Sequence, residues 1–198
     1  AHGTLGVVTE VALKTLPMLP ERATLVFPGV SAADAVAIFS AALATPFEVS
    51  GAAWHDGTAW MRIEGLGPQL AYRRARLLAL FKDRQVEVLD ADATLSLWRG
   101  LRDVAHFSAS DTPLWRVLVK PTDAPGVAAA LQALGGQTSL DWGGGLIWYA
   151  GPGAPDAVRA IAPHATLIRR AGLTGPAFAP LAPTVAALQA GLRRTFDP

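Results

Sequence analysis

The sequence predicts an α+β fold, a duplicated βαββαβ (split-βαβ) domain with a mainly antiparallel sheet that helices cover on one face. Two observations lead to this prediction. Strand-like and helix-like periodicities recur in the same order in both halves of the chain. In addition, Trp54 and Trp60 bracket the turn of the first expected hairpin at the same spacing at which Trp142 and Trp148 bracket the glycine-rich turn of the second.

The first predicted unit covers about residues 22–89. A β-rich run opens it and ends at Pro28, Ser31 is the expected N-cap of the next helix, and Asp56-Gly57 marks a hairpin turn. In order, the expected elements are a strand at 22–28, a helix at 31–44, a hairpin at 47–66, a helix at 68–82 and a strand at 85–89.

The second predicted unit covers about residues 114–169 and follows a connecting helix at 91–104. Pro121 closes its opening strand as Pro28 closes that of the first unit. The expected elements are a strand at 114–120, a helix at 124–134, a hairpin at 137–150, a helix at 155–162 and a strand at 165–169. A loop rich in alanine and proline then leads to a final helix at 183–194.

Alternation along the strands predicts a charged face on the sheet. Charged and apolar residues alternate in the second strand of the first hairpin and in the opening strand of the second unit. If helices cover the apolar face, the opposite face carries Arg62, Glu64, Arg116 and Lys120. Such a face is either a solvated surface or the roof of a charged site.

The turn of the first hairpin leaves one question open. A two-residue turn at Asp56-Gly57 puts Trp54 and Trp60 on opposite faces of the sheet, whereas an odd-numbered loop pairs them directly. The sequence is compatible with both arrangements.

The composition excludes several classes of function. Apolar residues make up 51% of the chain and charged residues 17%, as is typical of a globular protein. The absence of cysteine excludes disulfides, thiolate metal sites and cysteine-ligated iron–sulfur clusters. A balanced charge without a basic run argues against nucleic-acid binding. No apolar stretch reaches the roughly 20 residues of a membrane-spanning helix, and no signal peptide opens the chain.

The most informative motif opens the chain: Gly3-Thr4-Leu5-Gly6-Val7-Val8-Thr9-Glu10. By its residues alone it is a glycine turn that enters a buried strand. It closely resembles the segment that ends the flavin-binding domain of FAD-linked oxidases of the vanillyl-alcohol oxidase type. That resemblance implies that residues 1–20 are the remnant of an FAD-binding domain and 21–198 a cap domain. It also implies flavin contacts at Gly3, Gly6, Val7, Val8 and Thr9.

Further segments are similar to the FAD-binding E subunits of bacterial glycolate oxidases. They include Leu114-Trp115-Arg116, Asp141-Trp142-Gly143-Gly144, His164-Ala165-Thr166, Phe178-Ala179-Pro180-Leu181 and Phe196-Asp197-Pro198.

The similarity implies FAD as the cofactor and a small 2-hydroxy acid such as glycolate as the substrate. It also implies the flavin D subunit and the iron–sulfur F subunit as partners, in the cytoplasm or at the inner membrane through those partners. The family's pyrophosphate-binding loops lie N-terminal to the segment at Gly3, and the family continues beyond Pro198. The chain is therefore expected to be cut at both ends and inactive alone.

Oxidation of a 2-hydroxy acid at a flavin needs a cation for the carboxylate and a base for the hydroxyl proton. Arg116 is the first candidate for a carboxylate clamp and Arg62 the second, although each could instead form a surface salt bridge, for example between Arg62 and Glu64. His164, at the start of the last strand, is the candidate base, with a bond to a backbone carbonyl as the alternative.

Neither His55 nor His106 is expected to bind a metal, since both lack partners at metal-ligand spacing. Related catalytic subunits carry a histidine cluster near the substrate. Its absence here suggests an electron-relaying or structural subunit. Asp141-Trp142 is a further site candidate, with a core or interface tryptophan as the alternative.

Two other functions remain open at this point. A duplicated split-βαβ sheet also serves as a non-catalytic module for ligand binding or subunit contact. Within the oxidase family, the substrate could be lactate or another hydroxy acid, since nothing in the sequence fixes its size.

Overall fold

The computed structural model describes residues 7–15 and 18–196. The chain divides into two compact units. The larger unit covers Leu19–Phe178 and contains the sheet, while the other consists of Ala1–Met18 and Ala179–Pro198. Each unit is described separately below.

The first predicted repeat is present in the larger unit. Ser31 is the N-cap of its first helix, as expected, because its Oγ accepts a hydrogen bond from the Asp34 N–H at 3.1 Å. In chain order the elements are β1 (Glu21–Pro28), α1 (Ala32–Leu43), β2 (Val49–His55), β3 (Thr58–Gly65), α2 (Gly67–Leu80) and β4 (Glu87–Leu89).

The second repeat follows the connecting helix α3 (Ala91–Arg102) and the short 3-10 helix η1 (Ala105–Phe107). Its strands are β5 (Leu114–Leu118), β6 (Gln137–Asp141), β7 (Leu146–Ala150) and β8 (Thr166–Arg169). Its helices are α4 (Ala124–Gln132) and α5 (Pro155–Ile161). The 3-10 turn η2 (Pro121–Asp123) precedes α4, and the 3-10 turn η3 (Trp142–Gly144) joins β6 to β7.

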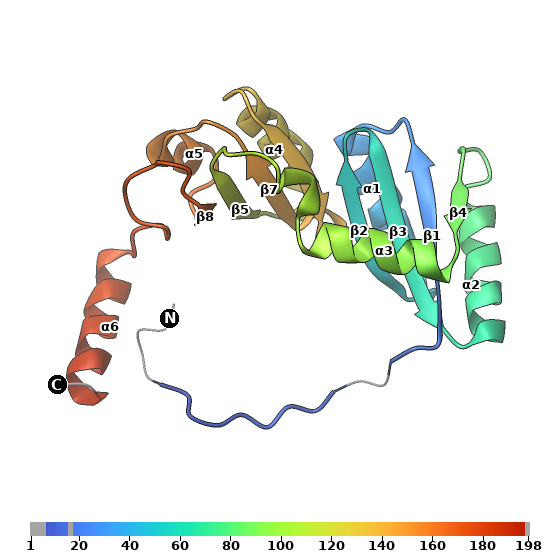
Figure 1. The fold of residues 1–198 in the computed structure, drawn as a ribbon, viewed down its shortest axis with the longest axis horizontal. Coiled ribbons are helices and arrows are strands. Elements are labelled where there is room, and N and C mark those ends of the chain that lie inside the picture. The colour runs from blue at the N-terminus through green and yellow to red at the C-terminus, as the bar shows by residue number, and fades with distance from the viewer. Residues whose placement is uncertain (1–6, 16–17, 197–198) are drawn as a thin grey trace. The chain divides into compact units, whose positions relative to one another are not determined.

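All eight strands form one antiparallel sheet in the order β4-β1-β3-β2-β6-β7-β5-β8 (Figure 1). The second half of this order mirrors the first, with each repeat contributing four neighbouring strands. The repeats join where β2 pairs with β6, through Trp54 with Leu140 and His55 with Ser139. The structure therefore confirms the α+β class and the duplication that the sequence predicted.

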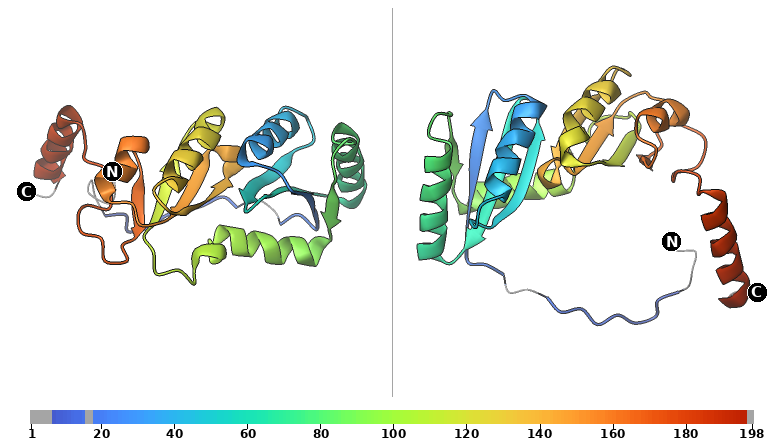
Figure 2. Two further views of the ribbon diagram at one scale, coloured as in Figure 1. Left: turned by 90° about the horizontal axis from the view of Figure 1, so that it is seen from above. Right: turned by 180° about the vertical axis from the view of Figure 1, so that it is seen from behind.

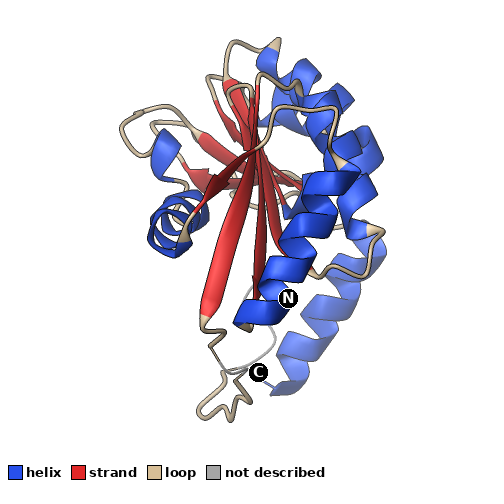
Figure 3. Ribbon diagram, turned by 90° about the vertical axis from the view of Figure 1, so that its right-hand side faces the viewer, coloured by secondary structure: helices blue, strands red, loops and turns tan. Residues whose placement is uncertain are grey.

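Four helices cover one face of this sheet, whereas α3 runs across the opposite face (Figures 2 and 3). The prediction that helices lie on one face is thus correct for α1, α2, α4 and α5 and wrong for α3. Periodicity predicts that a helix forms but not which sheet face it covers. Of the residues of α3, only Thr94 is fully buried. The face beneath α3 is the one predicted to carry charges.

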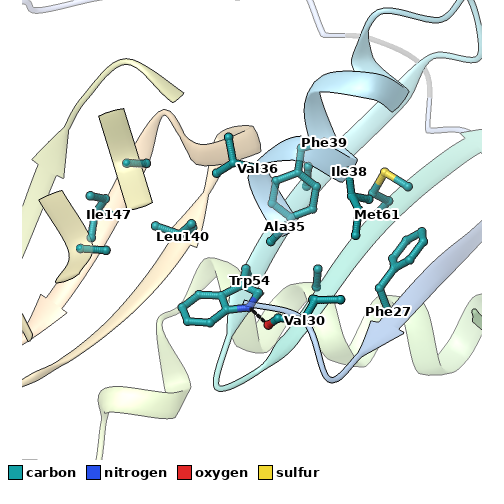
Figure 4. Packing of buried hydrophobic residues seen from close by; sticks show 14 of the residues in the cluster. Phe27, Val30, Ala35, Val36, Ile38, Phe39, Trp54, Met61, Leu140 and Ile147 are labelled. Atoms are coloured by element: carbon teal, nitrogen blue, oxygen red, sulfur yellow. Dashed lines mark hydrogen bonds between the residues drawn. The ribbon is translucent and has the colours of Figure 1, made fainter. Parts of the chain in front are cut away.

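The main core lies between the four helices and the sheet and continues through both repeats (Figure 4). It includes Phe27 and Met61 from the first repeat, Leu140 and Ile147 from the second, and Phe39 from α1. Continuity of these buried contacts across β2 and β6 binds the two repeats into one unit.

The first hairpin turn has two residues, Asp56 (φ 45°) and Gly57 (φ 76°). The left-handed backbone at both positions fits the Asp-Gly pair. Trp54 therefore faces the core, where its Nε1 donates to the Val30 carbonyl at 2.8 Å (Figure 4), and Trp60 lies half-buried on the opposite face. This outcome decides between the two arrangements that the sequence left open.

The smaller unit contains helix α6 (Pro183–Phe196), close to the prediction of 183–194. The buried strand expected after the opening glycines is absent at residues 7–15, where the backbone has no regular structure and Val7 and Val8 are 91% and 74% exposed. A β-branched run forms a strand only beside a partner strand, and the structure gives these residues none. The predicted contacts Gly3 and Gly6 lie outside the described residues.

Candidate functional site

A pocket of about 720 Å³ lies on the sheet face crossed by α3, entirely within the larger unit. Strands of both repeats form its floor, and α3 borders it. Its polar lining is dominated by arginines, with three tryptophans and two carboxylates. These residues are Arg22, Arg62, Arg99, Arg102, Arg116, Trp98, Trp142, Trp148, Glu64 and Asp141.

Both predicted clamp residues, Arg116 and Arg62, line this pocket, whereas Lys120 lies exposed outside it. Arg116 extends from β5 and Arg62 from β3, so each repeat contributes one. The expected charged face is therefore the floor of a pocket rather than only a solvated surface.

Arg62 is held by several partners. It forms an ion pair with Glu64 at 3.2 Å, and its Nε donates to Ser50 Oγ at 3.1 Å. Its guanidinium also lies 4.8 Å from the ring centroid of Trp98 on α3. The salt bridge considered as an alternative is thus present, and these contacts hold the Arg62 guanidinium against Glu64 and Ser50.

Arg116 is held differently. Its guanidinium lies 5.1 Å from the ring centroid of Trp142, and it makes no ion pair or hydrogen bond within the described part of the chain. A half-buried guanidinium with free donors is suited to a bidentate carboxylate. Arg116 is therefore the better placed of the two predicted clamps.

Asp141 ends β6 and lies half-buried in the pocket. Its Oδ1 accepts the N–H of Trp142 at 2.7 Å and so stabilises the turn into η3. Burial raises the pKa of Asp141, while the Trp142 N–H and the charge of Arg62 oppose that rise. Among the residues placed by the structure, no cation forms a salt bridge with Asp141.

His164 is not part of this pocket. It lies exposed in the turn before β8, two residues before the first residue of the strand that it was expected to open. A histidine next to a strand can fall on either side of the strand's end, and the sequence pattern does not fix which. The structure thus brings Arg116 and Arg62 together and leaves His164 apart.

Two other histidines meet at the junction of the repeats. The rings of His55 and His106 lie 4.4 Å apart, and His106 Nε2 is 2.9 Å from Ser139 Oγ. Burial, with a smaller contribution from the charge of His55, lowers the pKa of His106 to about 4. His106 is therefore neutral at neutral pH and makes a structural contact with the ring of His55.

Sequence reasoning missed the contribution of α3 to the pocket, namely Thr94, Leu95, Trp98, Arg99 and Arg102. The available signal was the marked separation of polar and apolar residues on this helix, with two arginines in its last turn. Thr94 is fully buried, and its hydroxyl has no hydrogen-bond partner in the described structure.

Fold and pocket together define a class: an α+β domain of two split-βαβ repeats with an arginine-lined pocket on the sheet face that α3 crosses. No protein-family model matches the chain. The chain is 29% identical over 205 aligned residues to the glycolate oxidase subunit GlcE of Escherichia coli (strain K12). The alignment covers 100% of this chain and 52% of that protein, so the chain spans about half the length of its relative.

The comparison confirms the resemblance that the motifs indicated. Within the described residues, no helix is both long enough and apolar enough to cross a membrane.

Proposed function

We propose that the complete protein is the FAD-binding subunit of a glycolate oxidase complex. It oxidises glycolate, or another small 2-hydroxy acid, to the 2-oxo acid or relays the electrons of that oxidation. The similarity to GlcE along the whole chain supports this proposal, as does the pocket that contains Arg116. Its partners would be the flavin D and iron–sulfur F subunits of such a complex.

In this proposal, residues 1–20 belong to the flavin-binding domain and residues 21–198 to the cap. Val7, Val8 and Thr9 fit a flavin contact, because they are exposed and their backbone groups form no hydrogen bond within the described residues. Gly3 and Gly6 would contribute the same contact. FAD, when bound, accepts the electrons of the substrate.

The observation that carries the proposal is the free guanidinium of Arg116. It binds the carboxylate of the acid through two parallel N–H···O bonds, and Trp142 keeps it from swinging into solvent. Arg62 is anchored by Glu64 and Ser50 and contributes positive potential rather than a direct clamp. His164 remains a candidate base only if a movement of its turn or another subunit brings it to the substrate.

Arg116→Met tests the proposal in the complete protein assembled with its partner subunits. The loss of charge-assisted hydrogen bonds is worth about 1.5–3 kcal/mol and should lower kcat/KM for glycolate about 10- to 100-fold. Arg74→Met, which removes an exposed arginine of α2 outside the pocket, is the matched control and should change kcat/KM less than about twofold. Equal activity of both variants would contradict the role of Arg116.

One observation favours a second candidate, a non-catalytic ligand-binding module. All residues lining the pocket lie between Arg22 and Trp148, so the pocket needs no residue of a flavin domain. This candidate predicts that the complete protein binds small organic acids but contains no flavin. Copurification of FAD would decide against it.

A further inference from the structure

The pocket floor has a simple arrangement of charges. In the strand order, β6 lies two strands from β3 and two strands from β5. Asp141 on β6 therefore lies between the strands that carry Arg62 and Arg116. By the register of the sheet, each arginine is also displaced by two residues along its strand from the position level with Asp141. All three side chains line the same pocket.

The two carboxylates of the pocket are in different states. Glu64 is paired with Arg62, whereas Asp141 uses Oδ1 for the Trp142 N–H and has no hydrogen-bond partner for Oδ2 among the residues described. An unused carboxylate oxygen on a pocket wall can accept a hydrogen bond from solvent or from a ligand. Neither neighbouring arginine forms a hydrogen bond to it, so it is available to a ligand donor.

We infer that Asp141 is a specificity-determining residue that accepts the hydroxyl hydrogen bond of a 2-hydroxy acid whose carboxylate is bound by Arg116. This inference rests on the proposed function for its ligand class. The donor that Asp141 lacks is the group that separates a 2-hydroxy acid from a plain carboxylic acid.

The energetic consequence is a preference between two acids of nearly equal size. Both acids bring a carboxylate near Asp141, but only glycolate offers a hydroxyl donor to it in return. A site built to bond a hydroxyl discriminates strongly against the analogue that lacks it, because its own polar group is then desolvated and unpaired. The 198-residue chain should therefore bind glycolate at least about tenfold more tightly than acetate.

Asp141→Asn provides the sharpest test. The amide oxygen of asparagine can still accept the Trp142 N–H, so the turn is kept, while a donor replaces the unused acceptor. Titration of the chain with glycolate and with acetate, followed by the NMR shifts of the tryptophan indoles, gives both dissociation constants. The expected result is that Asp141→Asn weakens the preference for glycolate and leaves acetate binding equal or tighter, because a neutral amide donor to the hydroxyl oxygen replaces a charged acceptor of the hydroxyl hydrogen.

Two comparisons complete the design. Arg116→Met should weaken both acids equally, because it removes the carboxylate clamp and not the hydroxyl contact. Asp141→Ser, which can still accept the Trp142 N–H but is too short to reach a ligand, is the second variant if Asp141→Asn does not fold; it should lose the preference.

The inference is overturned if the wild-type chain binds acetate as tightly as glycolate, if it binds neither acid, or if the variants at position 141 keep the preference. The first and third results leave the proposed function untouched, since it is tested by flavin absorption and by glycolate turnover of the complete protein. Failure to bind either acid would contradict the Arg116 clamp as well.

Discussion

Single residues decide what the pocket can bind. Arg62 and Arg116 are the same residue type on equivalent faces of two strands, and strand alternation predicted both positions. Their partners differ, since Arg62 is fixed by Glu64 and Ser50 while Arg116 only stacks on Trp142. Alternation predicts a side chain's face but not its neighbours across the sheet, and these neighbours anchor Arg62 while Arg116 is without a hydrogen-bond or ion-pair partner in the described residues.

The stacked pair of His55 and His106 predicts a pH dependence of stability. The pKa of His106 is about 4 in the folded protein and about 6.5 when unfolded. Between these values the unfolded chain binds more protons, so the free energy of unfolding falls as pH drops from about 6.5 to 4. With an allowance for solvent screening of this half-buried ring, the loss is about 1–2 kcal/mol.

Urea unfolding of wild type and His106→Gln at pH values above and below this window measures the effect. The glutamine variant should lose less stability on acidification than wild type. His164→Gln, which replaces an exposed histidine, should behave as wild type. If His106→Gln and wild type show the same pH dependence, the account of this pair is wrong.

At the scale of elements, the first hairpin shows what a local sequence signal achieves. The Asp56-Gly57 turn sets the register, which directs Trp54 into the core and Trp60 to the opposite face. Trp54→Phe removes the donor to the buried Val30 carbonyl and should cost about 1–3 kcal/mol.

Trp60→Phe in the same hairpin is the control, because the Trp60 indole makes no hydrogen bond within the described residues. It should cost distinctly less. Chemical denaturation of both variants gives the comparison, and a larger cost for Trp60→Phe would contradict the register described here.

Other elements could be predicted only in part. The boundaries of most strands and helices follow from periodicity, caps and turns, as at Ser31. The position of α3 over the charged face could not be predicted, because the amphipathic pattern of this helix does not specify which face of the sheet it covers. The strand expected at Val7 and Val8 failed for a related reason, since a strand depends on a pairing partner that the local sequence does not contain.

At the scale of the whole molecule, the two repeats share a sheet joined by the β2–β6 pairing and one continuous core. The junction in the sheet is narrow, but the core includes residues of α1 and α4 that reach across it. We expect residues 19–178 to unfold in a single cooperative transition. Near-ultraviolet and far-ultraviolet circular dichroism should give the same melting curve, whereas two separate transitions would indicate independently stable repeats.

The central claim is that this chain is part of a flavin-binding subunit. The most direct test is the visible absorption spectrum of the complete protein after purification and again after incubation with FAD. We predict a flavin absorption band that persists after removal of free cofactor. A complete protein that shows no flavin band, even after FAD is added, would contradict the claim.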